Sequence, residues 1–120
     1  MRISNKVKHL IKLVNMLLPK YKFDILMEAT VFKYIDIYYP LPYANDEPKY
    51  VGTILLNRRH SHPFKSTDIV LGLPTDNSSF REKLIKEWKS IGISFEADKT
   101  NSNENYYCYY KIWVEDNGNQ

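Results

Sequence analysis

The sequence predicts an α+β fold, a single two-layer domain in which two helices cover one face of a mainly antiparallel five-stranded sheet. Two segments carry apolar residues at helical spacing, and five runs rich in β-branched and aromatic residues are typical of strands. The 120 residues are 43% hydrophobic, which is typical of one globular domain. We therefore expect residues 1–120 to form one domain in the order helix, three strands, helix, two strands, with a frayed end at residues 117–120.

The first helix is expected over residues 4–18. Ser4 is a suitable N-cap, and apolar residues recur every three or four positions from Val7 to Leu18. Lysines occupy the opposite side, and Pro19 ends the pattern. The spacing predicts an amphipathic helix that buries its apolar stripe against the sheet.

Three strands are expected between the two helices. The longest run, residues 24–39, is rich in β-branched and aromatic side chains and predicts one continuous strand. Lys33 would otherwise fall on its apolar face, so we expect a β-bulge near that residue. The proline-rich residues 40–48 then separate this strand from two shorter ones, over residues 50–57 and 68–73.

The second helix is expected to begin with a capping box formed by Ser79 and Glu82, and to end at Gly92 in the left-handed conformation. Arg81 falls inside the apolar stripe of this helix. Because Arg81 is in the first turn, we expect its side chain to snorkel to the surface, with stacking on Trp88 or extension around the edge of the domain as the alternatives. The last two strands are expected over residues 93–97 and 106–115.

Aromatic residues occupy the face of the predicted sheet that would normally be polar. In the last strand, one set of alternate residues is apolar enough for the core, yet the opposite set is rich in aromatic rings as well. A large aromatic surface opposite the helices suits contact with a partner better than contact with water. We therefore predict a partner-binding face formed by Tyr107, Tyr109, Trp113, Phe32, Tyr34 and Tyr38.

The densest basic segment lies between the second and third strands and contains Arg58, Arg59, His60, His62 and Lys65. Arginine can bind a phosphate through two hydrogen bonds, and histidine can exchange protons near neutral pH. These residues are the candidate nucleic-acid contacts, and His60 or His62 is the candidate acid or base of a small RNase. No Glu or Tyr at a recognisable spacing completes such a pair, so a solvated basic loop is the simpler interpretation.

No catalytic or cofactor motif occurs in the sequence. It lacks a glycine-rich phosphate loop, a Gly-x-Ser-x-Gly nucleophile elbow and a His-Glu-x-x-His metal motif. His60 and His62 supply two metal ligands, but no third ligand occurs in a matching context. We therefore predict no catalytic residues, no metal and no cofactor, in a protein that is not an enzyme.

Charge is distributed unevenly along the chain. The formal net charge is +3, yet six basic residues precede the first acidic one, and the remaining 11 basic residues face all 14 acidic ones. A mildly acidic body does not favour a dedicated nucleic-acid binder. A single cysteine, no secretory leader and no apolar stretch near the length of a membrane span predict a cytoplasmic protein without a membrane partner.

These observations favour a small non-enzymatic cytosolic binding protein. We expect an inhibitor, or an immunity or anti-defence factor, that contacts another protein through the aromatic face. Lys, Asn, Ile and Tyr are frequent, a bias that AT-rich codons produce and that suggests a mobile element. The alternatives are a nucleic-acid-binding module that uses the basic loop 58–65, the first helix and aromatic stacking, and a small RNase-type toxin. A further alternative is that the aromatic face pairs two copies of the chain into a homo-oligomer.

Overall fold

The computed structural model describes residues 3–28, 31–39, 48–56, 67–76, 78–98 and 106–115, without the side chains of residues 26–28 and 31–33. The proline-rich connection over residues 40–47, the basic loop 58–65 and the end at 117–120 lie outside the described residues. The predictions made for those segments stay predictions.

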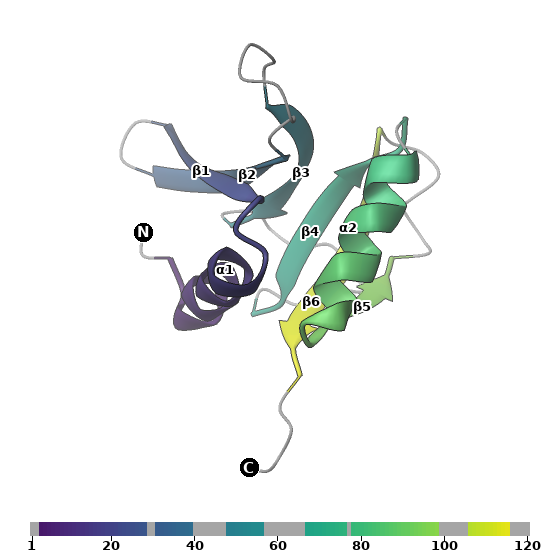
Figure 1. Ribbon diagram of the computed structural model, residues 1–120. Coiled ribbons are helices and arrows are strands. Elements are labelled where there is room, and N and C mark those ends of the chain that lie inside the picture. Colours follow the sequence, from purple (N-terminus) through teal and green to yellow (C-terminus); the bar gives the residue numbers. More distant parts are fainter. Residues whose placement is uncertain are drawn as a thin grey trace.

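The described residues form an α+β domain with two helices and an antiparallel sheet of six strands (Figure 1). The elements in chain order are α1 (Asn5–Leu17), β1 (Lys22–Glu28), β2 (Val31–Tyr39), β3 (Lys49–Leu55), β4 (Ile69–Pro74), α2 (Ser78–Ser90), β5 (Ile93–Ala97) and β6 (Tyr107–Val114). Across the sheet the strand order is β1-β2-β3-β4-β6-β5. The predicted fold class is confirmed. Neither of the described helices combines the length and the apolar character needed to cross a membrane.

The first predicted strand is in fact two strands. The sequence predicts one strand over residues 24–39, whereas the structure has an antiparallel hairpin of β1 and β2. The expected count of five strands is therefore wrong. No glycine, proline or asparagine marks residues 29–30, so the usual signal of a tight turn is absent. The pairing of β1 with β2 skips Lys33, which confirms the irregularity expected there.

Both helices bury most of the stripe that their spacing predicts, although Leu17 at the end of α1 is 50% exposed. The Ser4 hydroxyl accepts a hydrogen bond from the Val7 amide at 3.3 Å, and Gly92 follows α2 with a φ of 99°. Because α2 begins at Ser78, Ser79 lies inside the first turn and is not the N-cap that the sequence predicts. Residues from both helices and from the sheet share one core, so both helices pack on the same face; among these residues are Leu10, Val14, Leu84, Trp88, Ile35, Ile54, Leu71 and Ile112.

A polar cluster joins the start of β1 to α2 on this helical face. The hydroxyl of the buried Tyr21 donates a hydrogen bond to Glu87 Oε1 at 2.6 Å, and the Lys20 ammonium pairs with the other carboxylate oxygen. Burial opposes ionisation of Glu87, but these two donors outweigh it and lower the pKa of the carboxyl. The charged residues of the cluster thus serve the packing of the domain.

The sheet is paired least at its centre. β3 and β4 pair over three residue positions, from Thr53 opposite Gly72 to Leu55 opposite Val70. Beyond this short stretch the beginning of β3 and the end of β4 diverge (Figure 1). The end of β4 instead pairs with the beginning of β6. Side chains on the opposite face of the sheet bridge this opening.

Candidate functional site

The face of the sheet opposite the helices carries the aromatic residues. Ile35 and Ile37 of β2 and Ile112 of β6 enter the core, so the alternate residues of these strands point to the other side. There the sheet forms a groove with a volume of about 560 Å³. This aromatic groove is lined by Tyr34, Asp36, Tyr38, Tyr50, Thr53, Leu55, Tyr107 and Tyr109.

The tyrosine rings of the groove hold one another in place. The rings of Tyr107 and Tyr109 stack with centroids 6.1 Å apart and planes inclined by 20°. Tyr38 and Tyr50 meet edge to face at 5.8 Å. The hydroxyl oxygens of Tyr50 and Tyr107 lie 3.0 Å apart and share a hydrogen bond. The aromatic surface is therefore formed before any partner arrives.

Gly72 of β4 allows the two rings of β6 to lie over the sheet. A Cβ atom at this position would be 3.1 Å from Tyr109 Cε1 and 3.3 Å from Tyr107 Cδ2, closer than ordinary contact. Because glycine has no side chain, the rings can cross β4 and bring the Tyr107 hydroxyl to Tyr50. Without a side chain at Gly72, the two rings can therefore lie close to the backbone of β4.

Tyr50 reaches the groove because of a bulge in β3. Ile37 is opposite Gly52 and Tyr38 is opposite Tyr50, so Val51 is the extra residue. Strict alternation from the core residue Ile54 would instead place Tyr50 on the helical face. Sequence reasoning therefore missed Tyr50, since alternation alone does not reveal a bulge.

Among the described residues that line the groove, Asp36 is the charged one. In the strand register it is opposite Asp24 of β1 and Thr53 of β3. Partial burial raises the pKa of the Asp36 carboxyl, the Thr53 hydroxyl opposes the rise, and the charge of Asp24 adds to it. Asp36 was also absent from the predicted site, although its alternation with Tyr34 and Tyr38 was a usable signal.

The structure brings together four of the six residues predicted for the binding face. Tyr34, Tyr38, Tyr107 and Tyr109 all line the aromatic groove. Trp113 lies farther along the same side of β6, with the Lys111 ammonium 5.4 Å from its ring centroid. The sixth, Phe32, is paired with Met27 through its backbone, and its side chain lies outside the described residues.

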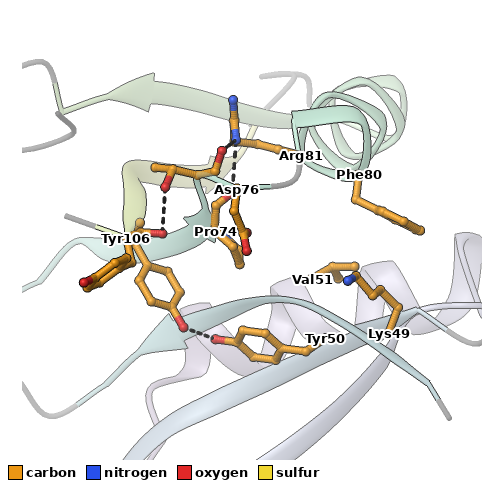
Figure 2. A pocket seen from close by; sticks show the side chains of 10 residues that line it. Lys49, Tyr50, Val51, Pro74, Asp76, Phe80, Arg81 and Tyr106 are labelled. Atoms are coloured by element: carbon orange, nitrogen blue, oxygen red, sulfur yellow. Dashed lines mark hydrogen bonds between the residues drawn. The ribbon is translucent and has the colours of Figure 1, made fainter. Parts of the chain in front are cut away.

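A smaller hollow of about 310 Å³ adjoins the aromatic groove where β3 and β4 diverge. Tyr50 and Tyr107 line both spaces, and their hydroxyls share a hydrogen bond where the spaces meet. Figure 2 shows the hollow with Tyr50 at its edge. The other lining residues are Lys49, Val51, Pro74, Thr75, Asp76, Phe80, Arg81 and Tyr106.

Arg81 closes the hollow on the side of α2. Its Nη1 donates hydrogen bonds to the carbonyl oxygens of Pro74 at 3.0 Å and Thr75 at 3.2 Å (Figure 2). The side chain therefore reaches back to the end of β4. Through these two hydrogen bonds Arg81 supports the end of β4.

The candidate nucleic-acid contacts Arg58, Arg59, His60, His62 and Lys65 lie outside the described residues. Among the residues that the structure does describe, no group of three or more His, Cys, Asp or Glu side chains could hold a metal ion.

Comparison with protein-family models, with curated proteins and with solved structures finds no match for this chain. The chemistry of the aromatic groove is therefore the basis for the function proposed below.

Proposed function

We propose that the protein is a small non-enzymatic binding protein that holds another protein against the aromatic face of its sheet. The observation that carries this proposal is the groove of about 560 Å³ with five tyrosines among its lining residues. Tyrosine supplies a large contact area and a polar hydroxyl with few rotatable bonds, and it is enriched at binding hot spots. An inhibitor or an immunity or anti-defence factor is the class of protein that fits such a surface on a small domain.

The preformed arrangement of the rings supports this role. Immobilising a flexible side chain on binding opposes affinity by about 0.5–1.5 kcal/mol. Here the stacked pair Tyr107 and Tyr109, and the hydroxyl contact from Tyr107 to Tyr50, already restrict the rings. Binding of a partner should therefore cost little further side-chain entropy, because the rings are already ordered in the folded protein.

The charge in the groove favours a protein over a nucleic acid. A strand of DNA or RNA that stacked its bases on these rings would bring phosphates near Asp36 and the neighbouring Asp24. Among the residues that the structure describes, no lysine or arginine lines the groove to offset that repulsion. A protein partner has no such restriction on its charge.

The proposal is tested by affinity capture from extracts of the cells that express the protein, followed by measurement with the purified partner. Tyr109→Ala and Tyr38→Ala should each weaken binding by about 2 kcal/mol, close to 30-fold. The control is Leu17→Ala, because Leu17 is 50% exposed on α1, which lies on the helical face. Equal affinity of the groove variants and the control would refute the proposed site.

Salt dependence separates a protein partner from a nucleic acid. Affinity for phosphates falls by orders of magnitude between about 50 and 200 mM salt, whereas an interface built on rings changes little. A steep loss of affinity over this range, together with nuclease sensitivity of the captured material, would support the nucleic-acid alternative.

A further inference from the structure

Asp36 places one carboxylate among the tyrosines that line the aromatic groove. It lies on β2 between Tyr34 and Tyr38. The other tyrosines that line the groove are Tyr50, Tyr107 and Tyr109. The ion pairs formed within the described residues are Lys20 with Glu87 and Lys111 with Asp68. Among the described residues, Asp36 has no cationic partner. The groove therefore carries a negative charge that no cation of the described residues neutralises, and a bound partner can supply that cation.

The surroundings of Asp36 favour a cation as its occupant. The face of a tyrosine ring is electronegative and attracts a positive group within about 6 Å. A carboxylate that has lost part of its hydration also gains more from a nearby cation than an exposed carboxylate does. In accord with this, partial burial and the charge of Asp24 raise the pKa of Asp36. An incoming cation would offset the repulsion from Asp24 and would give the carboxylate hydrogen bonds in place of the lost water.

The guanidinium of arginine fits this combination better than the ammonium of lysine. It is planar, stacks on aromatic rings, and can donate two parallel hydrogen bonds to one carboxylate. It is also less strongly hydrated, so its transfer into a half-buried groove is less unfavourable. Its remaining N–H groups can reach hydroxyl oxygens, which the groove supplies at Thr53, Tyr50 and Tyr107.

We propose that the aromatic groove binds an arginine side chain of the partner protein, with the guanidinium paired to Asp36 and stacked on the tyrosine rings. This inference rests on the proposed function, because it names the group that a protein partner presents to the aromatic face. The inference defines the partner by its chemistry, as a protein that presents an exposed arginine with no acidic residue beside it. A volume of about 560 Å³ accommodates such a side chain and part of the adjoining backbone.

Titration of the isotope-labelled protein with three short peptides tests this directly by NMR. The peptides are acetyl-Gly-X-Gly-amide, in which X is arginine, lysine or citrulline; citrulline has the shape of arginine without its charge. We expect the arginine peptide to shift amide signals of β2, β3 and β6 saturably, at concentrations up to about 10 mM, where even a Kd of about 1 mM is nearly saturated. The citrulline and lysine peptides should bind at least about 10-fold and 3-fold more weakly, respectively.

Asp36→Asn should weaken binding of the arginine peptide about 10-fold or more, since it removes the charge and keeps the side-chain size. The matched control is Glu96→Gln, because Glu96 is an exposed carboxylate opposite Lys111 on β5 and does not line the groove. The control should bind the arginine peptide as the wild type does. Circular dichroism and the amide spectrum of each variant verify that it is folded.

Equal shifts from the arginine and citrulline peptides, unchanged binding by Asp36→Asn, or no saturable shift at these amides would each overturn the arginine inference. Equal binding of arginine and lysine would overturn the preference for guanidinium. The proposed function fails separately, through the captured partner. If Tyr109→Ala abolishes that capture while Asp36→Asn leaves it intact, the aromatic face binds a protein and the inferred arginine is wrong.

Discussion

Asp36 lines the aromatic groove together with five tyrosines and is opposite a second acidic residue, Asp24, in the β1 to β2 pair. Burial and this neighbouring charge raise its pKa in the folded state. The folded protein therefore binds more protons than the unfolded chain in the interval between the two pKa values. Stability falls as the pH rises through that interval, and it stays reduced at neutral pH.

Asp36→Asn is accordingly expected to raise the melting temperature at pH 7. The gain should shrink as the pH falls toward 3, where Asp36 is protonated in both states and the wild type no longer carries the unfavourable charge. Thermal unfolding of the wild type and the variant across this range measures the effect, with Glu96→Gln as the control. A variant that is less stable than the wild type at pH 7 would contradict the unfavourable environment assigned to Asp36.

Two glycines on neighbouring strands form a matched pair that tests the packing on either side of the sheet. A Cβ on Gly52 would lie 2.6 Å from Leu73 Cδ2 and 2.9 Å from the Gly72 carbonyl oxygen. Gly52→Ala should therefore destabilise the domain by about 1–3 kcal/mol, because backbone has to move. For a Cβ on Gly72, the nearest atoms belong to the rings of Tyr107 and Tyr109.

The Gly72→Ala variant should consequently lose less than about 1 kcal/mol and still change the environment of the tyrosines. Chemical denaturation gives the stability of both variants, and near-ultraviolet circular dichroism reports on the rings. If Gly72→Ala lost as much stability as Gly52→Ala without a change in the tyrosine signal, the rings would not lie over β4 as described.

At the level of secondary-structure elements, the two helices could be predicted because their apolar spacing and their terminal signals agree. Ser4 caps α1 and Gly92 follows α2 in the left-handed conformation, as expected from the sequence. The strands were harder. Residues 24–39 alternate like one strand, and no turn residue marks the point where β1 gives way to β2.

The candidate site could be predicted only in strands whose side chains point to alternate faces of the sheet without interruption. In β6 this held, so Tyr107 and Tyr109 were assigned to the correct face. In β3 the extra residue Val51 reverses the side on which Tyr50 lies. Gly72 belongs to the site because it lies beneath two rings of the neighbouring strand β6. This contact depends on the register of β4 and β6, which the sequence of one strand does not reveal.

Packing of α2 against the sheet is tested by Leu84→Ala. Leu84 is 1% exposed within the shared core, so truncation should leave a cavity and destabilise the domain by about 2–5 kcal/mol. Urea denaturation measures this difference. Leu17→Ala, at a half-exposed position of α1, should change stability by no more than about 0.5 kcal/mol. Similar values for the two variants would contradict the packing of α2 described here.

On the scale of the whole molecule, the two faces of the sheet have different roles. Apolar stripes of α1 and α2 fill one face, while the other carries the aromatic groove and Asp36. Fold class followed from local patterns, because amphipathic helices and a half-apolar sheet have few ways to bury their surfaces together. Residues of three strands, β2, β3 and β6, line the groove, so it is a property of the complete sheet that no segment encodes alone.

The basic loop is expected to take no part in binding a protein partner. Replacing Arg58, Arg59, His60 and His62 together by Ser should leave the melting temperature nearly unchanged and the partner affinity within about threefold, since a solvated basic loop adds little to an interface that depends on tyrosine rings. Thermal unfolding and calorimetric titration measure the two quantities. Loss of nucleic-acid retention or of RNA cleavage in this variant would instead favour the nucleic-acid or RNase alternative.

Affinity of the purified partner for the wild type, Tyr109→Ala, Tyr38→Ala and Leu17→Ala tests binding at the aromatic face most directly. Calorimetric titration at one salt concentration, with folded variants, should show a loss of about 2 kcal/mol for each tyrosine variant and no change for Leu17→Ala. Hydrogen exchange in the complex should slow in β2, β3 and β6. Unchanged affinity of both tyrosine variants, or protection confined to α1 and α2, would show that the partner binds elsewhere.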